Sequence, residues 1–266
     1  MSEPTRTHQA IQRLQGKHAL VTGGGSGIGA AIALALVEQG AHVTVLGRRL
    51  DALQNLTKQH PDTMHAVCAD VSDATQVVNA VTNAQERFGP IHILVNNAGQ
   101  ATSAPFLKTD AALWNQMLAV NLTGTFVCTQ AVLPQMLQAG WGRIVNVAST
   151  AGLNGYAYVA AYSAAKHGVI GLTKSLALEV AKKGITVNAV CPGYTETDIL
   201  RESIANVVAK TGRSEVDARA EFAKGNPQGR IVQPSEVADA VLWLCGEGAS
   251  SITGQSIAVC GGEVMH

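Results

Sequence analysis

Residues 17–39 read KHALVTGGGSGIGAAIALALVEQ, which is a short apolar run, a string of glycines and an alanine-rich run in succession. The apolar run from Lys17 to Thr22 predicts a buried strand, and the run from Ala30 to Gln39 predicts a helix. Glycines between a strand and a helix let the backbone approach a pyrophosphate, to which the first helical turn presents unbonded N–H groups. A tight turn that binds nothing is the alternative. The pattern predicts a dinucleotide site made by Gly23, Gly25, Ser26, Gly27, Ile28 and Gly29.

The alternation of apolar and helical runs continues along the chain. Further strands are expected at residues 41–46, 64–69, 91–95, 143–148, 185–190 and 253–259, and helices at residues 50–59, 74–88, 110–138, 158–182 and 234–245. The strands are apolar without polar alternation, which is typical of a parallel sheet covered on both faces. The predicted fold class is α/β: a single doubly wound domain of the Rossmann type with about seven parallel strands. This domain is expected to span residues 16–266, with residues 1–15 as an N-terminal extension.

The composition of the 266 residues, 47% hydrophobic and 14% charged, is that of a chain able to bury a substantial core. Nineteen basic residues balance nineteen acidic ones, so nothing in the charge favours nucleic acid or an anionic membrane as a partner. The five cysteines are widely spaced and form no C-x-x-C pair, which argues against a metal site or a disulfide framework. With no signal peptide in residues 1–15 and no run of 18 apolar residues, a soluble cytoplasmic protein is expected.

Tyr162 and Lys166 lie four residues apart in the expected helix 158–182, so their side chains fall on one face. At about 5 Å and an effective dielectric of about 20, an ammonium stabilises a tyrosinate by roughly 3 kcal/mol, or about two pKa units. Such a phenol could exchange protons near neutral pH. Ser149 follows the strand 143–148, at the edge where parallel strands deliver side chains to ligands. The alternative for the tyrosine and lysine is an amphipathic surface pair.

The second expected strand ends in Gly47, Arg48 and Arg49, and no acid follows until Asp51. In dinucleotide-binding folds this position contacts the adenosine ribose, where an acid favours a free 2′-hydroxyl and an arginine accommodates a 2′-phosphate. Arg48 and Arg49 therefore favour NADP(H), with NAD(H) as the alternative.

Three more expected strands end in candidate cofactor contacts. The acid after the third strand is left for an adenine amino group because Asp73 is placed to cap the next helix. Small and amide residues after the fourth strand leave room for a flat ring, and the proline-glycine turn after the sixth suits the carboxamide edge of a nicotinamide. These contacts are Asp70, Val71, Asn97, Ala98, Gly99, Pro192, Gly193 and Thr195.

Asn121 lies in an otherwise apolar part of the expected helix 110–138. Because an unpaired buried amide costs about 1 to 3 kcal/mol, it needs partners. It is either a satisfied core residue or a link, through water, to the Lys166 ammonium. Residues 196–229 are abruptly charged and follow a strand end, which predicts a helical lid over the pocket.

The motifs occur together and in order: Thr22-Gly-x-x-x-Gly27-x-Gly29, Asn97-Ala-Gly99, Asn121, Ser149, Tyr162-x-x-x-Lys166 and Pro192-Gly193. In this combination the chain resembles a short-chain dehydrogenase/reductase over roughly residues 16–262. The resemblance implies that Tyr162 exchanges the proton, Ser149 orients the carbonyl or alcohol, and Asn121 holds a water. It also implies that Lys166 binds the nicotinamide ribose and depresses the tyrosine pKa, that Tyr162 and Lys166 contact the cofactor, and that helices 110–138 and 158–182 form a homotetramer.

Within that family, segments 146–150, 184–193, 233–237 and 259–262 are especially similar to aromatic polyketide ketoreductases, which are relatives of 3-oxoacyl-thioester reductases. Ser26 stands where many NADP-using relatives carry a basic residue, so the 2′-phosphate would rest mainly on Arg48 and Arg49.

The predicted function is that of an NAD(P)(H)-dependent oxidoreductase (EC 1.1.1.-) that reduces a ketone to the secondary alcohol with NADPH. The resemblance points to a 3-oxoacyl thioester, carried by CoA or a carrier protein, or a polyketide-like substrate. One alternative is an NAD(P)-dependent dehydrogenase of a secondary alcohol such as a 3-hydroxyacyl-CoA, a cyclic alcohol or a steroid. The other is a non-catalytic nucleotide-sensing protein, against which all four catalytic groups are present.

Overall fold

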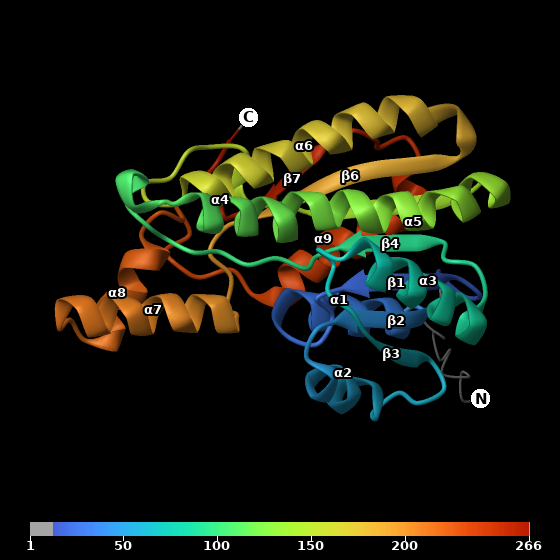
Figure 1. Cartoon of the computed structure of the whole chain (residues 1–266), viewed down its shortest axis with the longest axis horizontal. Coiled ribbons are helices and arrows are strands. Elements are labelled where there is room, and N and C mark those ends of the chain that lie inside the picture. Colours follow the sequence, from blue (N-terminus) through green and yellow to red (C-terminus); the bar gives the residue numbers. More distant parts are fainter. Residues whose placement is uncertain (1–12, 266) are drawn as a thin grey trace, which may run out of the picture.

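The structure, a computed structural model that describes residues 13–265, contains one sheet of seven parallel strands in the order β3-β2-β1-β4-β5-β6-β7 (Figure 1). The strands are β1 (His18–Thr22), β2 (His42–Gly47), β3 (Met64–Cys68), β4 (Ile93–Asn96), β5 (Gly142–Val147), β6 (Ile185–Pro192) and β7 (Ser256–Val259). The predicted doubly wound sheet is therefore confirmed. Because β1 lies between β2 and β4, the strand order reverses there, and ligands of such sheets bind beyond the carboxyl ends at this point.

Helices cover both faces of the sheet (Figure 1). The helices are α1 (Gly27–Glu38), α2 (Leu50–Thr57), α3 (Ala74–Phe88), α4 (Ala111–Leu118), α5 (Gly124–Ala139), α6 (Ala160–Val180), α7 (Asp198–Thr211), α8 (Glu215–Ala223) and α9 (Pro234–Cys245). Helices α1 and α9 pack against each other on one face, while α3, α5 and α6 cover the other. Helices α7 and α8 form a hairpin at one end of the molecule, beyond the sheet (Figure 1).

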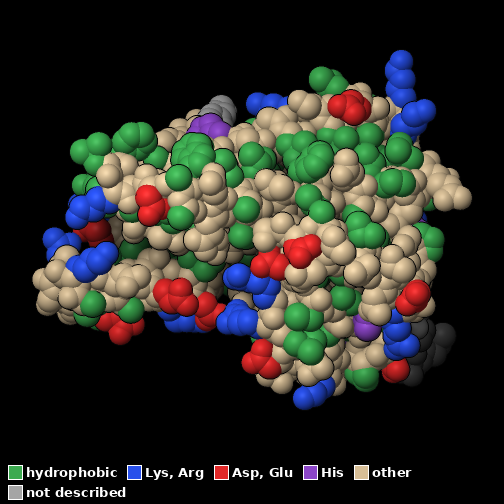
Figure 2. All heavy atoms as spheres, viewed as in Figure 1, with side chains coloured by type: hydrophobic (Ala, Val, Ile, Leu, Met, Phe, Trp, Pro, Cys, Tyr) green, Lys and Arg blue, Asp and Glu red, His purple; other side chains and the backbone are tan. Residues whose placement is uncertain are grey.

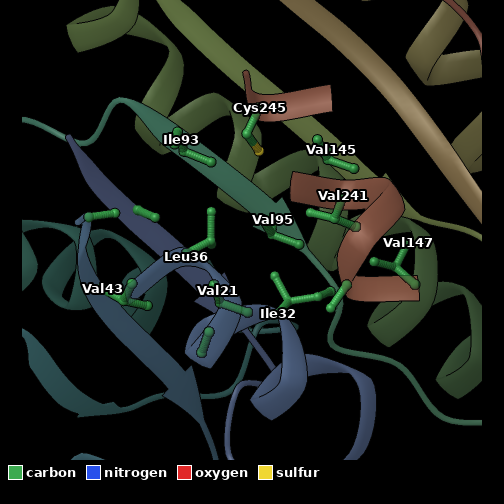
Figure 3. Packing of buried hydrophobic residues seen from close by; sticks show 14 of the residues in the cluster. Val21, Ile32, Leu36, Val43, Ile93, Val95, Val145, Val147, Val241 and Cys245 are labelled. Carbon is green, nitrogen blue, oxygen red and sulfur yellow. The ribbon is translucent and has the colours of Figure 1, made fainter. Parts of the chain in front are cut away.

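The two faces of the sheet carry separate hydrophobic cores because successive side chains of a strand point to opposite sides. In β1, Val21 packs with α1 and α9, whereas Leu20 packs with α3 and α5. Figure 3 shows the first of these cores, in which side chains from β1, β2, β4 and β5 meet those of α1 and α9. Strands buried on both sides explain why the sequence shows apolar runs without polar alternation.

The helix expected over residues 110–138 is not continuous. A π-helical turn, Ala119–Thr123, separates α4 from α5 and contains Asn121. Such turns occur as single insertions within α-helices, often at functional sites. Helix α1 also begins earlier than expected, at Gly27, because the glycines of the turn already form its first residues.

The packed part of the chain begins before the predicted start of the domain. Of the proposed extension 1–15, residues 1–12 lie outside the described part. Leu14 is buried in the core and its N–H donates to the Gln39 carbonyl, so the packed body begins before residue 16.

Within residues 13–265, one helical segment, Ala111–Ala139, is long and apolar enough to cross a membrane. Because its α5 part packs on α3, β4 and β5, it occupies the place of a helix that covers a sheet.

Figure 2 shows one face of the molecule, on which hydrophobic side chains gather in the upper part and charged side chains lie at several places. Hydrophobic side chains gather over α4, α5 and α6, where Phe126, Leu137 and Leu178 are exposed. Charged side chains of both signs are interspersed on the α7–α8 hairpin, where Arg201 pairs with Asp198 and Arg213 with Glu221.

Candidate active site

The glycine turn after β1 is held against the end of β4 by hydrogen bonds. The Thr22 hydroxyl accepts from the backbone N–H groups of Asn97 and Ala98, each at 3.0 Å. The Asn97 amide donates to the carbonyl oxygens of Thr22 at 3.0 Å and Gly23 at 3.3 Å. The amide donors of Asn97 therefore hold the turn together.

Glycine is required at position 29 by close backbone contact. A Cβ atom there would lie 2.2 Å from the Gly23 carbonyl oxygen and 2.5 Å from Asn97 Nδ2. No side chain fits those distances, so the turn folds back on the start of α1 only because Gly29 lacks one.

The start of α1 suits a bound dinucleotide. Ser26 is its N-cap residue but makes no side-chain capping bond, which leaves the N–H groups at Gly27 and Ile28 for a ligand. Gly25 lies beside them in the same turn. The Ser26 hydroxyl instead accepts from Arg49 Nη2 at 3.2 Å, so an arginine is held beside the glycine turn.

The ends of β2 and β3 meet beside this turn. Arg48 Nη1 lies 3.8 Å from Asp70 Oδ2, in an ion pair in which the arginine is largely exposed. Asp73 caps α3 as expected, by accepting from the N–H groups of Thr75 and Gln76. Asp70 Oδ1 accepts from the Ser72 backbone and hydroxyl while its Oδ2 faces Arg48, and its contact with an adenine amino group stays a prediction. The side chain of Val71 is buried in the core.

Ser149, Tyr162 and Lys166 meet beyond the carboxyl end of β5. Lys166 is 4% exposed, so it is not part of a surface pair. Its Nζ lies 5.7 Å from the centroid of the Tyr162 ring and donates to the Val147 carbonyl at 2.8 Å. An ammonium has three N–H donors, and with one bound inside the described chain, the other two fit the hydroxyls of a nucleotide ribose.

The pKa of Tyr162 departs from its ordinary value in the opposite direction to the prediction. Burial raises the pKa of the phenol, and a hydrogen bond with Ser149 lowers it in part. The prediction that Lys166 depresses it is wrong for this structure, because desolvation of the buried phenolate dominates and the ammonium is directed at the Val147 carbonyl. Burial also lowers the pKa of Lys166, to about 8.

Asn121 lies close to Lys166 but its side chain is occupied. Its Oδ1 accepts from the Gln100 N–H at 3.2 Å, and its Nδ2 donates to the carbonyls of Gln100 at 2.9 Å and Met117 at 3.0 Å. The side chain therefore has the partners that a buried amide needs, and the link through water to Lys166 stays a prediction. Gly99 lies close to both the Asn121 amide and the Lys166 ammonium. A Cβ on Gly99 would be 2.8 Å from Asn121 Oδ1 and 3.7 Å from Lys166 Nζ.

The turn after β6 is held by backbone and side-chain hydrogen bonds. Pro192 ends the strand in register with Val259 of β7, and the Gly193 N–H donates to the Val259 carbonyl at 3.1 Å. Thr195 is buried, and its hydroxyl donates to the Gly193 carbonyl at 3.0 Å. The turn is thereby fixed beside the end of β5.

Residues that the sequence reasoning did not assign also face this site. Tyr194 lies near enough to Tyr162 to raise the pKa of that phenol further. Its ring packs edge-on against Phe222 of α8, at 4.9 Å between centroids. Tyr156 donates to Glu263 Oε1 at 2.6 Å. No local signal could have paired these last two residues, because 107 positions separate them.

The fold and this site define a class of protein, and comparison with known families gives the same answer. A model of the family described as short chain dehydrogenase matches residues 17–207. The chain belongs to that family, whose members bind NAD(P), and it is an oxidoreductase.

Particular relatives show how similar the chain is to known members. It is 42% identical to a protein of Streptomyces coelicolor named as a ketoacyl reductase, over 92% of this chain and 95% of the relative. It is 40% identical to the D-beta-hydroxybutyrate dehydrogenase of Cupriavidus necator, over 95% of this chain and the whole relative. Among solved structures, actinorhodin polyketide ketoreductase with NADPH matches with a TM-score of 0.89 and 41% identity, over 93% and 97% of the two chains.

Proposed function

We propose that this enzyme reduces a ketone to a secondary alcohol with NADPH, and that Tyr162, Ser149, Lys166 and Asn121 carry the reaction. The observation that supports this most is the meeting of the first three at the carboxyl end of β5, beside the glycine turn of β1. The similarity to a ketoacyl reductase and a polyketide ketoreductase supports the same reaction.

In this proposal a bound nicotinamide supplies the hydride, and the chain supplies the proton and the orientation. Tyr162 donates its phenolic proton to the carbonyl oxygen, which Ser149 holds by a hydrogen bond. A tyrosine is protonated at neutral pH at its ordinary pKa of about 10, and burial raises the pKa of Tyr162 further, so the phenol holds the proton that a donor needs. Lys166, with a pKa of about 8, is mostly charged at pH 7 and binds the ribose hydroxyls through its remaining N–H donors. Asn121 is proposed to order a water through its main-chain carbonyl, which also accepts from the Thr125 hydroxyl at 3.1 Å, since its side chain is occupied.

The cofactor is proposed to lie along the carboxyl ends of β1, β2, β4 and β6. The N–H groups at Gly25, Gly27 and Ile28 bind the pyrophosphate, and Arg48 and Arg49 bind a 2′-phosphate. The bond between Arg49 and Ser26 supports this, because it holds a cation beside the turn although position 26 itself carries no charge.

The substrate is proposed to be a 3-oxoacyl thioester, on CoA or a carrier protein, or a polyketide-like ketone. A second candidate is the dehydrogenation of a secondary alcohol such as a 3-hydroxyacyl-CoA, and the similarity to a hydroxybutyrate dehydrogenase favours it. The α7–α8 hairpin is proposed as the lid over the substrate. We further propose a cytoplasmic homotetramer that buries the apolar surface of α4, α5 and α6.

The proposed chemistry is tested by Tyr162→Phe, which removes the proton donor and keeps the ring. Turnover of 3-oxoacyl thioesters and cyclic ketones should fall about 100- to 10,000-fold, the usual contribution of general acid catalysis. The dissociation constant for NADPH, measured by fluorescence, should change less than twofold. Near-normal turnover in this variant would reject Tyr162 as the acid.

A further inference from the structure

The segment that follows β7, residues 260–265, begins at the carboxyl end of the sheet and carries the carboxylate of Glu263. It is held by the Glu263 N–H, which donates to the Cys260 carbonyl at 3.2 Å, and by the Val264 N–H, which donates to Cys260 Sγ at 3.4 Å. These bonds place Glu263 against the turn that follows β6. A Cβ on Gly193 would lie 2.8 Å from Glu263 Oε2.

Glu263 contacts two segments that adjoin the proposed catalytic groups, the turn at Gly193 and the loop that carries Tyr156. Tyr156, which donates to Glu263 Oε1, lies in the loop between Ser149 and Tyr162 and is also hydrogen-bonded to Thr150. Burial raises the pKa of Tyr194, and the Glu263 carboxylate raises it further. Tyr194 directly follows Gly193, the residue against which Glu263 lies.

The charge of Glu263 is not neutralised by a neighbouring base. Within residues 13–265 no lysine, arginine or histidine forms an ion pair with it. Burial raises the pKa of Tyr156, and the bond to Glu263 raises it further, so this phenol keeps its proton and serves as a fixed donor to Oε1. The carboxylate is thus held in place by a neutral hydrogen-bond donor and not by a base.

We propose that Glu263 is a specificity-determining residue that excludes ketones bearing a free carboxylate and admits those whose remainder is uncharged, such as 3-oxo esters, amides and thioesters. This inference rests on the proposed ketone reduction. A free 3-oxo acid would bring a second negative charge to a half-buried site, where like charges several ångströms apart disfavour binding on the order of tenfold. A thioester or ester of the same acid carries no such charge and can accept hydrogen bonds from the surrounding phenols.

The test compares acetoacetate with ethyl acetoacetate, which share the reacting carbonyl and differ in the charge at the far end. The wild-type enzyme should prefer the ester in kcat/KM by at least about tenfold. Glu263→Gln should reduce that ratio about tenfold, through a rise in the kcat/KM for acetoacetate. The control variant Glu86→Gln changes net charge equally at an exposed position on α3, and should leave the ratio unchanged.

Tyr156→Phe provides a second variant, which keeps the Glu263 carboxylate and removes the hydroxyl that donates a hydrogen bond to it. It should retain the preference for the ester, and a ratio that collapses in this variant but not in Glu263→Gln would overturn the proposal. An unchanged ratio in Glu263→Gln, with NADPH affinity and melting temperature intact, would also overturn it. If neither compound is reduced by any of these proteins, the proposed ketone reduction itself fails, which is a distinct result.

Discussion

The burial of His18 predicts that the folded protein loses a defined part of its stability in mild acid. Its ring is buried at the amino end of β1, with Nδ1 2.8 Å from the Gly89 carbonyl and Nε2 2.9 Å from the Thr44 hydroxyl. Burial lowers its pKa from the ordinary 6.5 to about 4, opposed by the Gly89 carbonyl and assisted by the nearby rings of His92, His42 and His65. The folded protein therefore keeps this ring neutral where the unfolded chain protonates it.

The magnitude follows from the difference between the two pKa values. Because the folded pKa is the lower one, the unfolded state binds the extra proton, and stability present above pH 6.5 is lost as the pH falls toward 4. The full loss is about 3 kcal/mol, of which roughly 2 kcal/mol falls between pH 7 and pH 5. The substitution His18→Gln should abolish this part of the pH dependence, because glutamine can bond the same partners and does not titrate.

Urea unfolding at pH 7 and pH 5, at one protein concentration, measures the effect. The wild type should lose about 2 kcal/mol more than His18→Gln over this interval. A matched control, His167→Gln, changes an exposed histidine of α6 and should behave like the wild type. Equal losses in wild type and His18→Gln would refute the reasoning, since the titration would then not reside in His18.

Three further predictions address the cofactor site and the lid. Gly29→Ala should abolish NADPH binding and lower the melting temperature, because its Cβ would lie 2.2 Å from the Gly23 carbonyl oxygen. The control variant Gly171→Ala in α6 should bind NADPH normally, because a Cβ there meets nothing within 4 Å. NADPH should bind at least about tenfold tighter than NADH in fluorescence titrations, and the double variant Arg48→Ala, Arg49→Ala should bring the two affinities together; equal affinities in the wild type would remove the role given to these arginines. Hydrogen exchange over residues 197–225 should slow when product binds, and unchanged exchange would count against a lid.

Local patterns were sufficient for the sheet and for much of the site. The apolar runs and glycine turns predicted the strands, and the four-residue spacing of Tyr162 and Lys166 predicted that their functional groups share a site, as the 5.7 Å between Nζ and ring centroid confirms. These features depend on residues adjacent in sequence or on strand ends that meet at one edge of a parallel sheet. The roles assigned to the individual site residues stay predictions.

Other features depend on contacts that no local pattern contains. The direction of the Tyr162 pKa was wrong because the spacing gives the distance to Lys166 but not the desolvation by the surrounding fold. The bond between Tyr156 and Glu263 joins distant parts of the chain, and the partners of Asn121 depend on where the loop at Gln100 lies. Each of these is set by tertiary packing.

The π-helical turn at Ala119–Thr123 leaves the covering helix about one residue longer than a regular α-helix between the same ends. Deleting one residue there would restore uniform bonding and rotate one half of the helix against the other by about 100°. Asn121 would then swing away from the Gln100 backbone, and the loop at Gly99 would lose its anchor next to Lys166. A chain shortened in this way gains a more regular helix and loses the positions of Asn121 and of the loop at Gly99. The π-helical turn therefore limits how far this helix can be made regular by engineering.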